Sequence, residues 1–149
     1  MWCFTTCSNA FRGSSTDDIS WHNTVPFVPP VTDGKVIKVY DGDTITVAAK
    51  LPIAKSPVYR FPVRLAGIDS PEIKGKSDAE ITLAKKSRDA LSELILEKNV
   101  KLVNVSTEKY GRLLADVYIE GIHVNRWMLD NKYAIPYDGG TKSRPVEWN

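Results

Sequence analysis

The sequence has few of the features that stabilise small extracellular or membrane proteins. Only two of its 149 residues are cysteine, Cys3 and Cys7, and the remaining chain contains none, so the fold is not expected to depend on disulfides. No segment is apolar over the length of a membrane span, and the opening residues lack the basic and continuously apolar parts of a secretory signal. We therefore expect an intracellular protein with no transmembrane segment.

The chain also carries little net charge. A formal charge of +2 does not by itself indicate a nucleic-acid-binding protein, so any basic surface has to be local. With 149 residues and 42% hydrophobic composition, the chain fits one compact domain with a sizeable core.

Residues 1–31 differ in composition from the rest of the chain. They are rich in serine, threonine, asparagine and proline, which predicts an extended or disordered N-terminal arm and a folded domain over residues 32–149. Cys3 and Cys7 are interpreted first as part of a loose tail. Lipid attachment to these cysteines, giving weak membrane association, is the alternative.

The first part of the predicted domain has the pattern of β-strands. Two runs of β-branched residues, 36–40 and 45–47, flank Asp41-Gly42 and predict a hairpin with an Asp-Gly turn. Apolar residues then alternate over 59–65, which places Arg64 on the face opposite Leu65.

Helical and strand patterns then alternate to the end of the domain. A capping box, Ser77-Asp78-Ala79-Glu80, predicts the start of a helix over residues 78–98. Two strands, 100–105 and 113–119, and a second helix over 124–131 follow. This order predicts an α+β, β-rich fold: a five-stranded OB-type Greek-key barrel with two or three packed helices. Because OB folds bind many ligands, function has to be argued from the site.

Acidic and basic residues gather in three short motifs and one strand. The acidic motifs are Asp41-Gly42-Asp43-Thr44 and Asp69-Ser70-Pro71-Glu72, and the arginines are Arg64 and the last residue of Lys109-Tyr110-Gly111-Arg112. Taken singly, each motif is also typical of an ordinary turn or a solvated strand. Together, carboxylates that bind a hard cation and arginines that bind a phosphate are what a metal-assisted phosphodiesterase requires.

The order and spacing of these motifs, with Gly121 and Val124-Asn125 after them, resemble the staphylococcal nuclease-like (thermonuclease) domain family over about residues 33–138. The resemblance implies an OB-type barrel, a Ca²⁺ ion, and hydrolysis of DNA and RNA with low sequence specificity. It also implies cleavage of the bond to the 5′ oxygen, which leaves 3′-phosphate ends.

The resemblance also implies roles for the acidic residues. Asp43 and Asp69 correspond to direct Ca²⁺ ligands, and the backbone carbonyl of Ser70 to a third. Such oxygen donors suit Ca²⁺, whose shell water and a substrate phosphate oxygen can complete. Glu72 corresponds to the residue that holds the attacking water, either as general base or by orienting it.

Basic and aromatic residues correspond to the substrate side of the family's site. Arg64 and Arg112 would neutralise charge on the phosphate, with a donor geometry that lysine does not match. Lys109 and Tyr110 match positions that contact the phosphate and sugar of the nucleotide. Tyr137 is interpreted either as a residue that packs against a base or as a buried core tyrosine.

The expected partner is DNA or RNA, preferably single-stranded or flexible, and no obligate protein partner is indicated. His22 and His123 match no catalytic position of the family. A non-catalytic OB module that binds nucleic acid or protein is the competing hypothesis. Such modules typically lose acidic ligands or arginines, and this chain has them all.

Overall fold

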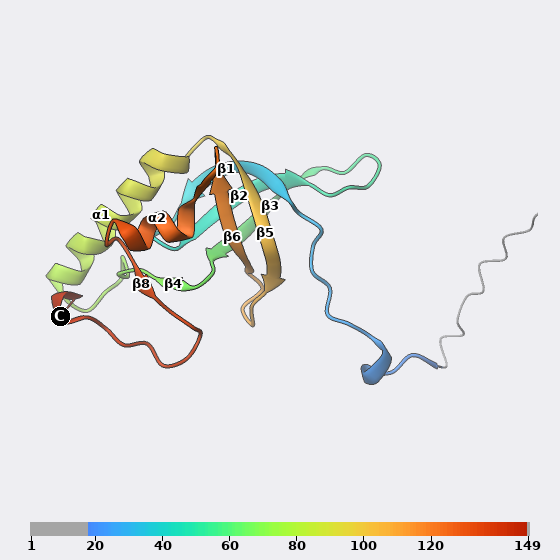
Figure 1. Ribbon diagram of the computed structural model, residues 1–149. Coiled ribbons are helices and arrows are strands. Elements are labelled where there is room, and N and C mark those ends of the chain that lie inside the picture. The colour runs from blue at the N-terminus through green and yellow to red at the C-terminus, as the bar shows by residue number, and fades with distance from the viewer. Residues whose placement is uncertain (1–17, 149) are drawn as a thin grey trace, which may run out of the picture.

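The computed structural model describes residues 18–148, and Figure 1 shows how their helices and strands are arranged. Residues 1–17, with Cys3 and Cys7, lie outside the described residues, so the predictions made for them stay predictions. The strands are β1 (Asp33–Val39), β2 (Thr44–Lys50), β3 (Val58–Leu65), β4 (Ile68–Asp69), β5 (Asn99–Thr107), β6 (Leu113–Ile119), β7 (Ile122–His123) and β8 (Ile135–Pro136). The helices are α1 (Asp78–Ile95) and α2 (Val124–Asp130), and two 3-10 turns span Trp21–Asn23 and Val146–Trp148.

Five of the strands form a closed barrel. They are hydrogen-bonded in the order β3-β2-β1-β5-β6, with antiparallel neighbours, and a parallel pairing of β3 with β6 closes the cylinder. In Figure 1, α1 and α2 lie together on one side of these strands. The predicted α+β fold, an OB-type barrel with packed helices, is confirmed.

Strict alternation of side chains fills the barrel. In β6 every second residue, from Leu113 to Ile119, is buried, and β2 alternates in the same way. Side chains of α1 and α2 complete one continuous core with those of the strands. Since successive residues of a strand point to opposite faces, this pattern fixes which polar residues face outward, at the barrel surface that carries the candidate site.

The β1–β2 hairpin is confirmed, but its turn is longer than a two-residue Asp-Gly turn, because residues 40–43 separate the two strands. Gly42 does not have a positive φ. Its role is close approach: a Cβ on Gly42 would lie 1.9 Å from the Ser87 hydroxyl oxygen of α1. The glycine therefore lets the turn that bears Asp43 pack directly on the helix.

Helix α1 begins as predicted and ends earlier than Lys98. Ser77 Oγ accepts a hydrogen bond from Glu80 N at 3.0 Å, which is the first half of the capping box. At the other end, Glu97 has φ +64° and its N–H donates to Val36 O, while Lys98 O accepts from Val36 N. These residues pair with β1 instead of continuing the helix, which is why α1 ends at Ile95.

Asn125 of α2 stabilises the seam of the barrel, which is the parallel pairing of β3 with β6 that closes it. Its buried side chain accepts from Val117 N at 2.9 Å and donates to Ala66 O at 2.8 Å and Ala115 O at 3.2 Å. These bonds tie the end of β3 to β6 where the two strands run parallel. The segment that carries Arg64 to Asp69 is fixed at this point.

The described residues before β1 run away from the barrel in Figure 1. Residues 19–30 contain the Trp21–Asn23 turn and otherwise no helix or strand, and Trp21 and Phe27 are exposed there. Among residues 18–148, neither helix has both the length and the apolar character needed to cross a bilayer.

Candidate active site

Asp43 and Arg64 are brought together by the register of two neighbouring strands. Thr44 of β2 is directly opposite Arg64 of β3, and Asp43 O accepts a hydrogen bond from Leu65 N at 2.8 Å. The side chains of Asp43 and Arg64 are 8% and 9% exposed, and Arg64 Nη2 lies 3.3 Å from Asp43 Oδ2. Their ion pair is therefore largely shielded from water. Charges that are buried in this way are only weakly screened by solvent and salt.

Asp69 reaches the same guanidinium from the other side. Gly67, with φ +75°, turns the chain after β3, and the short strand β4 then pairs with β8. Arg64 Nη2 lies 3.0 Å from Asp69 Oδ1, and Ser70 N donates to Asp43 Oδ2 at 3.0 Å. Two buried carboxylates thus converge around one arginine, with the Ser70 backbone beside them.

Asp41 adds a third acidic group next to this pair. Asp41 Oδ1 accepts a hydrogen bond from Asp43 N at 3.2 Å. Burial raises the pKa of Asp41 to about 7, and the negative charge of Asp43 acts in the same direction. Asp41 is therefore partly protonated near neutral pH, mainly because it is buried and to a lesser extent because of the neighbouring Asp43.

Glu72 and Arg112 complete the set of predicted catalytic residues. Both line a cavity that also contains Asp43, Arg64, Asp69 and Ser70. The side chain of Glu72 is 46% exposed, and that of Arg112 is 32% exposed and pairs with Glu108. The catalytic and metal-binding candidates therefore share one cavity. The carboxylates of Asp43 and Asp69 are buried in it, and Glu72 and Arg112 are more accessible to solvent.

A second cavity holds the predicted substrate-side residues. Lys109, Tyr110 and Tyr137 line it together with Arg64 and Arg112, so it adjoins the first. Tyr110 is 74% exposed, and Lys109 Nζ lies 4.9 Å from the centre of its ring. The Arg64 guanidinium lies 5.3 Å from the ring centre of half-buried Tyr137, so Tyr137 borders the cavity instead of filling the core.

The two histidines lie outside both cavities. His123 stacks on Tyr118 with the ring centres 4.6 Å apart, and His22 is exposed in the Trp21–Asn23 turn. Neither histidine lines either cavity.

Comparison with known proteins identifies the family of the chain. The model of the family described as "Staphylococcal nuclease homologue" matches residues 62–145, which is more than half of the chain. The chain belongs to this family. The matched region runs from β3 to the residues after β8, and includes Arg64, Asp69, Glu72 and Arg112.

Several proteins are similar to the chain. An "Uncharacterized endonuclease" of Haemophilus influenzae is 39% identical over 103 residues, covering 69% of this chain and 51% of that protein. An "Uncharacterized endonuclease" of Escherichia coli O157:H7 is 32% identical, covering 64% and 55%. A "Probable staphylococcal-like nuclease" of Oryza sativa subsp. japonica is 33% identical over 75 residues, covering 50% and 19%. The chain thus spans about half of the bacterial relatives and a smaller part of the plant one.

The oxygen donors fit a hard divalent cation with an incomplete protein shell. In residues 18–148 no group of three or more acidic, histidine or cysteine side chains is arranged to hold a metal ion. Two carboxylates, Asp43 and Asp69, do converge, since both lie within 3.3 Å of the same Arg64 nitrogen. Ca²⁺ and Mg²⁺ bind carboxylates while keeping waters and phosphate oxygens as further ligands, so two carboxylates suffice as the protein's share.

Sequence reasoning missed the basic residues that enter the site after β8. Lys142 Nζ lies 3.0 Å from Asp69 Oδ1 and 3.2 Å from Glu72 Oε1. Burial acts to lower the pKa of Lys142, but hydrogen bonds and attraction to Asp69 and Glu72 outweigh it, so the pKa is raised. The Asp138-Gly139-Gly140 run is the sequence signal that could have indicated a reversal of the chain here.

Glu80 was predicted only as a helix cap, and its carboxylate has a different role. It is 1% exposed, and its oxygens accept from Lys76 N at 3.1 Å and from Arg144 Nη1 at 2.9 Å. A Cβ on Gly75 would lie 2.5 Å from this carboxyl group, so glycine is needed there. Glu80 thus fixes the loop after Glu72 and anchors the residues that follow β8.

Proposed function

We propose that the protein is a Ca²⁺-dependent nuclease that hydrolyses phosphodiester bonds of DNA and RNA with low sequence specificity. The observation that supports this most is the shared cavity, in which buried Asp43 and Asp69 lie beside Arg64, with Glu72 and Arg112 on the same walls. Family membership and relatives named as nucleases support the same reaction class.

In this proposal Asp43 and Asp69 hold the cation, and the Ser70 carbonyl is a further candidate ligand. When bound, the divalent ion would polarise the phosphoryl oxygen and neutralise part of its charge. Arg64, held by these carboxylates, already has its guanidinium oriented toward the cavity. Preorganised donors of this kind lower the barrier because they need not reorient as charge develops.

Glu72 is proposed to hold the attacking water, as general base or as an orienting acceptor. Its carboxylate is more exposed than those of Asp43 and Asp69, so it has access to solvent water. The water oxygen would form the new bond to phosphorus and give up a proton to Glu72 or to solvent, while the bond to the 5′ oxygen breaks and that oxygen takes a proton from solvent water. The products would be a 3′-phosphate and a 5′-hydroxyl end.

Arg112 and the aromatic residues of the second cavity are proposed to hold the substrate. Arg112 presents a planar donor set that matches two phosphate oxygens. Tyr110 and Tyr137 offer faces on which unpaired bases can stack, and stacking tolerates any base. We therefore propose a preference for single-stranded or flexible nucleic acid.

The test is a matrix of substrates and cations. Single-stranded DNA, duplex DNA and single-stranded RNA of one sequence are incubated with the protein in Ca²⁺, Mg²⁺ or EGTA, and the end groups of the products are determined. We expect Ca²⁺-dependent cleavage, fastest on single strands, that leaves 3′-phosphates. Binding without turnover in every cation would contradict the proposal and favour the non-catalytic OB module.

Arg112→Ala and Arg126→Ala proteins, purified in parallel, control for contaminating nucleases. Arg126 is exposed on α2, and within residues 18–148 its one ion pair is with Asp130, so its variant should cleave like the wild type. Equal cleavage by the Arg112→Ala protein would point to a contaminant or to a different site.

A further inference from the structure

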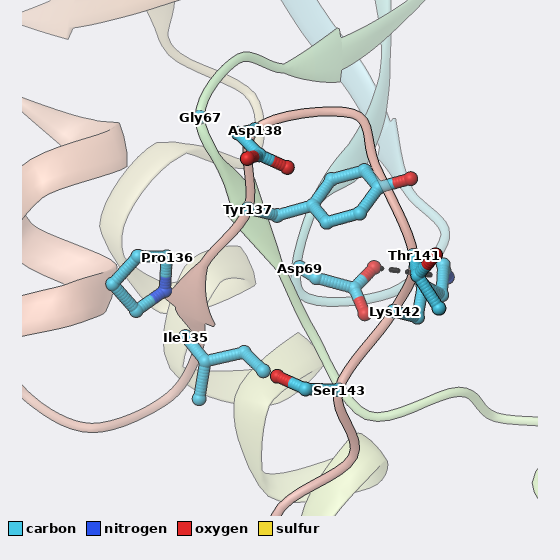
Figure 2. Close-up of a pocket in the computed structure, with 9 residues that line it drawn as sticks. All are labelled: Gly67, Asp69, Ile135, Pro136, Tyr137, Asp138, Thr141, Lys142 and Ser143. Atoms are coloured by element: carbon cyan, nitrogen blue, oxygen red, sulfur yellow. Dashed lines mark ion pairs between the residues drawn. The ribbon is translucent and has the colours of Figure 1, made fainter.

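Residues of the stretch 138–144 line a third cavity together with Asp69 and bring an ammonium group to the carboxylates of Asp69 and Glu72. Figure 2 shows Lys142 beside Asp69, with the ion pair drawn as a dashed line, while Thr141 and Ser143 flank it on the same stretch of chain. Lys142 Nζ also lies 3.2 Å from Glu72 Oε1. One lysine thus bridges a proposed cation ligand and the residue proposed to hold the attacking water.

This stretch, the 138–144 segment, is anchored at both ends. Before it, Tyr137 N donates to Gly67 O at 3.0 Å. At its end, Arg144 Nη1 lies 2.9 Å from the buried carboxylate of Glu80, and Trp148 beyond is 7% exposed. The anchors place Lys142 at the site in a defined way.

Between the anchors the segment is free to rearrange. Residues 138–143 are exposed and form no helix or strand, and Gly139 has φ +91°. Segments with few buried contacts and exposed backbone open at low free-energy cost. Lys142 can therefore leave the carboxylates without unfolding the barrel.

An ammonium and a divalent ion that bind Asp69 together repel each other, and the Arg64 guanidinium already adds positive charge there. Ca²⁺ binds carboxylate oxygens at about 2.3–2.6 Å. The Lys142 nitrogen is already 3.0 Å from Asp69 Oδ1, in a place where that carboxylate is 5% exposed and like charges are poorly screened. Ion binding to Asp69 therefore favours displacement of the ammonium.

We propose that Lys142 competes with the divalent cation for Asp69 and Glu72, and so sets the cation affinity of the site. This inference rests on the proposed function, because it presupposes that Asp69 binds a cation. Lys142 also lines the second cavity with Lys109 and Tyr110, so a displaced ammonium has the substrate side of the site within reach.

The test is Ca²⁺ binding by calorimetry, and Tb³⁺ binding by luminescence, to wild-type, Lys142→Met and Lys142→Arg proteins without nucleic acid. Lys74→Met is the matched control, because Lys74 is exposed and lines the same cavity as Lys142. Since the Lys142 side chain is 39% exposed, we expect its replacement by methionine to tighten Ca²⁺ binding by about tenfold, not by many orders of magnitude. Lys142→Arg should bind Ca²⁺ within about threefold of the wild type, because it keeps the charge.

Three outcomes are distinguishable. Tighter binding by Lys142→Met and not by Lys74→Met supports the competition. Equal affinities for wild-type and Lys142→Met proteins, or equal gains in the two methionine variants, overturn it and leave the proposed nuclease unaffected. If none of the proteins binds either ion at millimolar concentration while their unfolding transitions are intact, both the competition and the cation-dependent mechanism are refuted.

Discussion

Replacing Arg64 with methionine should destabilise the protein strongly when no divalent ion is present. Methionine keeps much of the apolar stem of arginine and removes the guanidinium that lies between Asp43 and Asp69. Both carboxylates are less than 10% exposed, so they would lose their shared cation without gaining water. The expected effect is therefore electrostatic and separate from any loss of packing.

The size of the expected loss in unfolding free energy depends on the partners that Asp43 and Asp69 keep. Removing one partner of a buried ion pair typically costs about 3–5 kcal/mol. Here Ser70 N still donates to Asp43 and Lys142 still pairs with Asp69, so the charges are partly compensated. We expect the free energy of unfolding to fall by about 2–4 kcal/mol, near the lower end of that range.

The assay is urea unfolding in EGTA, followed by tryptophan fluorescence. Trp127 and Trp148 are suitable probes, because one is packed against the core and the other is buried. The control is Arg60→Met on the same strand, which is exposed and should change stability by less than about 0.5 kcal/mol. Equal slopes against urea concentration would show that the comparison is of stability alone.

Adding Asp43→Asn to the Arg64→Met protein should restore part of the loss, because it removes one of the two uncompensated charges. A loss below about 1 kcal/mol for Arg64→Met, or no recovery in the double variant, would refute the idea that a buried charge cluster holds this site.

The remaining predictions concern the seam, the turn and the phosphate contact. Asn125→Ala should lower the free energy of unfolding by about 2–4 kcal/mol, because Val117 N, Ala66 O and Ala115 O lose their hydrogen bonds to the Asn125 side chain. Urea unfolding measures the loss, and a loss near zero would contradict the proposed role of Asn125 at the pairing of β3 with β6. Gly42→Ala should cost about 1–3 kcal/mol through overlap with Ser87 and Ser70. In thermal unfolding this cost should be smaller when Gly42→Ala is made in the Ser87→Gly protein than in the wild type, and an equal cost in the two would locate the strain elsewhere. Arg112→Lys should lower kcat on single-stranded DNA by about tenfold or more, since it keeps charge but loses the fork of donors, and an unchanged kcat would exclude bidentate contact.

Much of the fold could be predicted from the sequence because its signals are local. The alternation in β6 predicted its bounds without error, and Ser77 predicted the start of α1. The end of α1 was predicted three residues too late, because the pairing of Glu97 and Lys98 with β1 is a tertiary contact that no helical pattern contains.

The residues of the candidate site also fall into those that the sequence predicts and those that only the folded structure shows. Arg64 and Asp69 come from one continuous motif, and their meeting with Asp43 follows from the hairpin register. Lys142 and Arg144 follow β8 in a segment without periodicity, and only the folded chain brings them to Asp69 and Glu80. Long-range ion pairs of this kind leave no spacing signal in the sequence.

Metal-assisted hydrolysis in this one cavity is tested by the single-turnover rate at which wild-type and Glu72→Gln proteins cleave a single-stranded DNA in saturating Ca²⁺. The amide keeps the size of the side chain and removes its capacity to take a proton. We predict a fall in rate of about 10²–10⁴-fold with Ca²⁺ binding retained. A Glu72→Gln protein that cleaves as fast as the wild type would contradict the account.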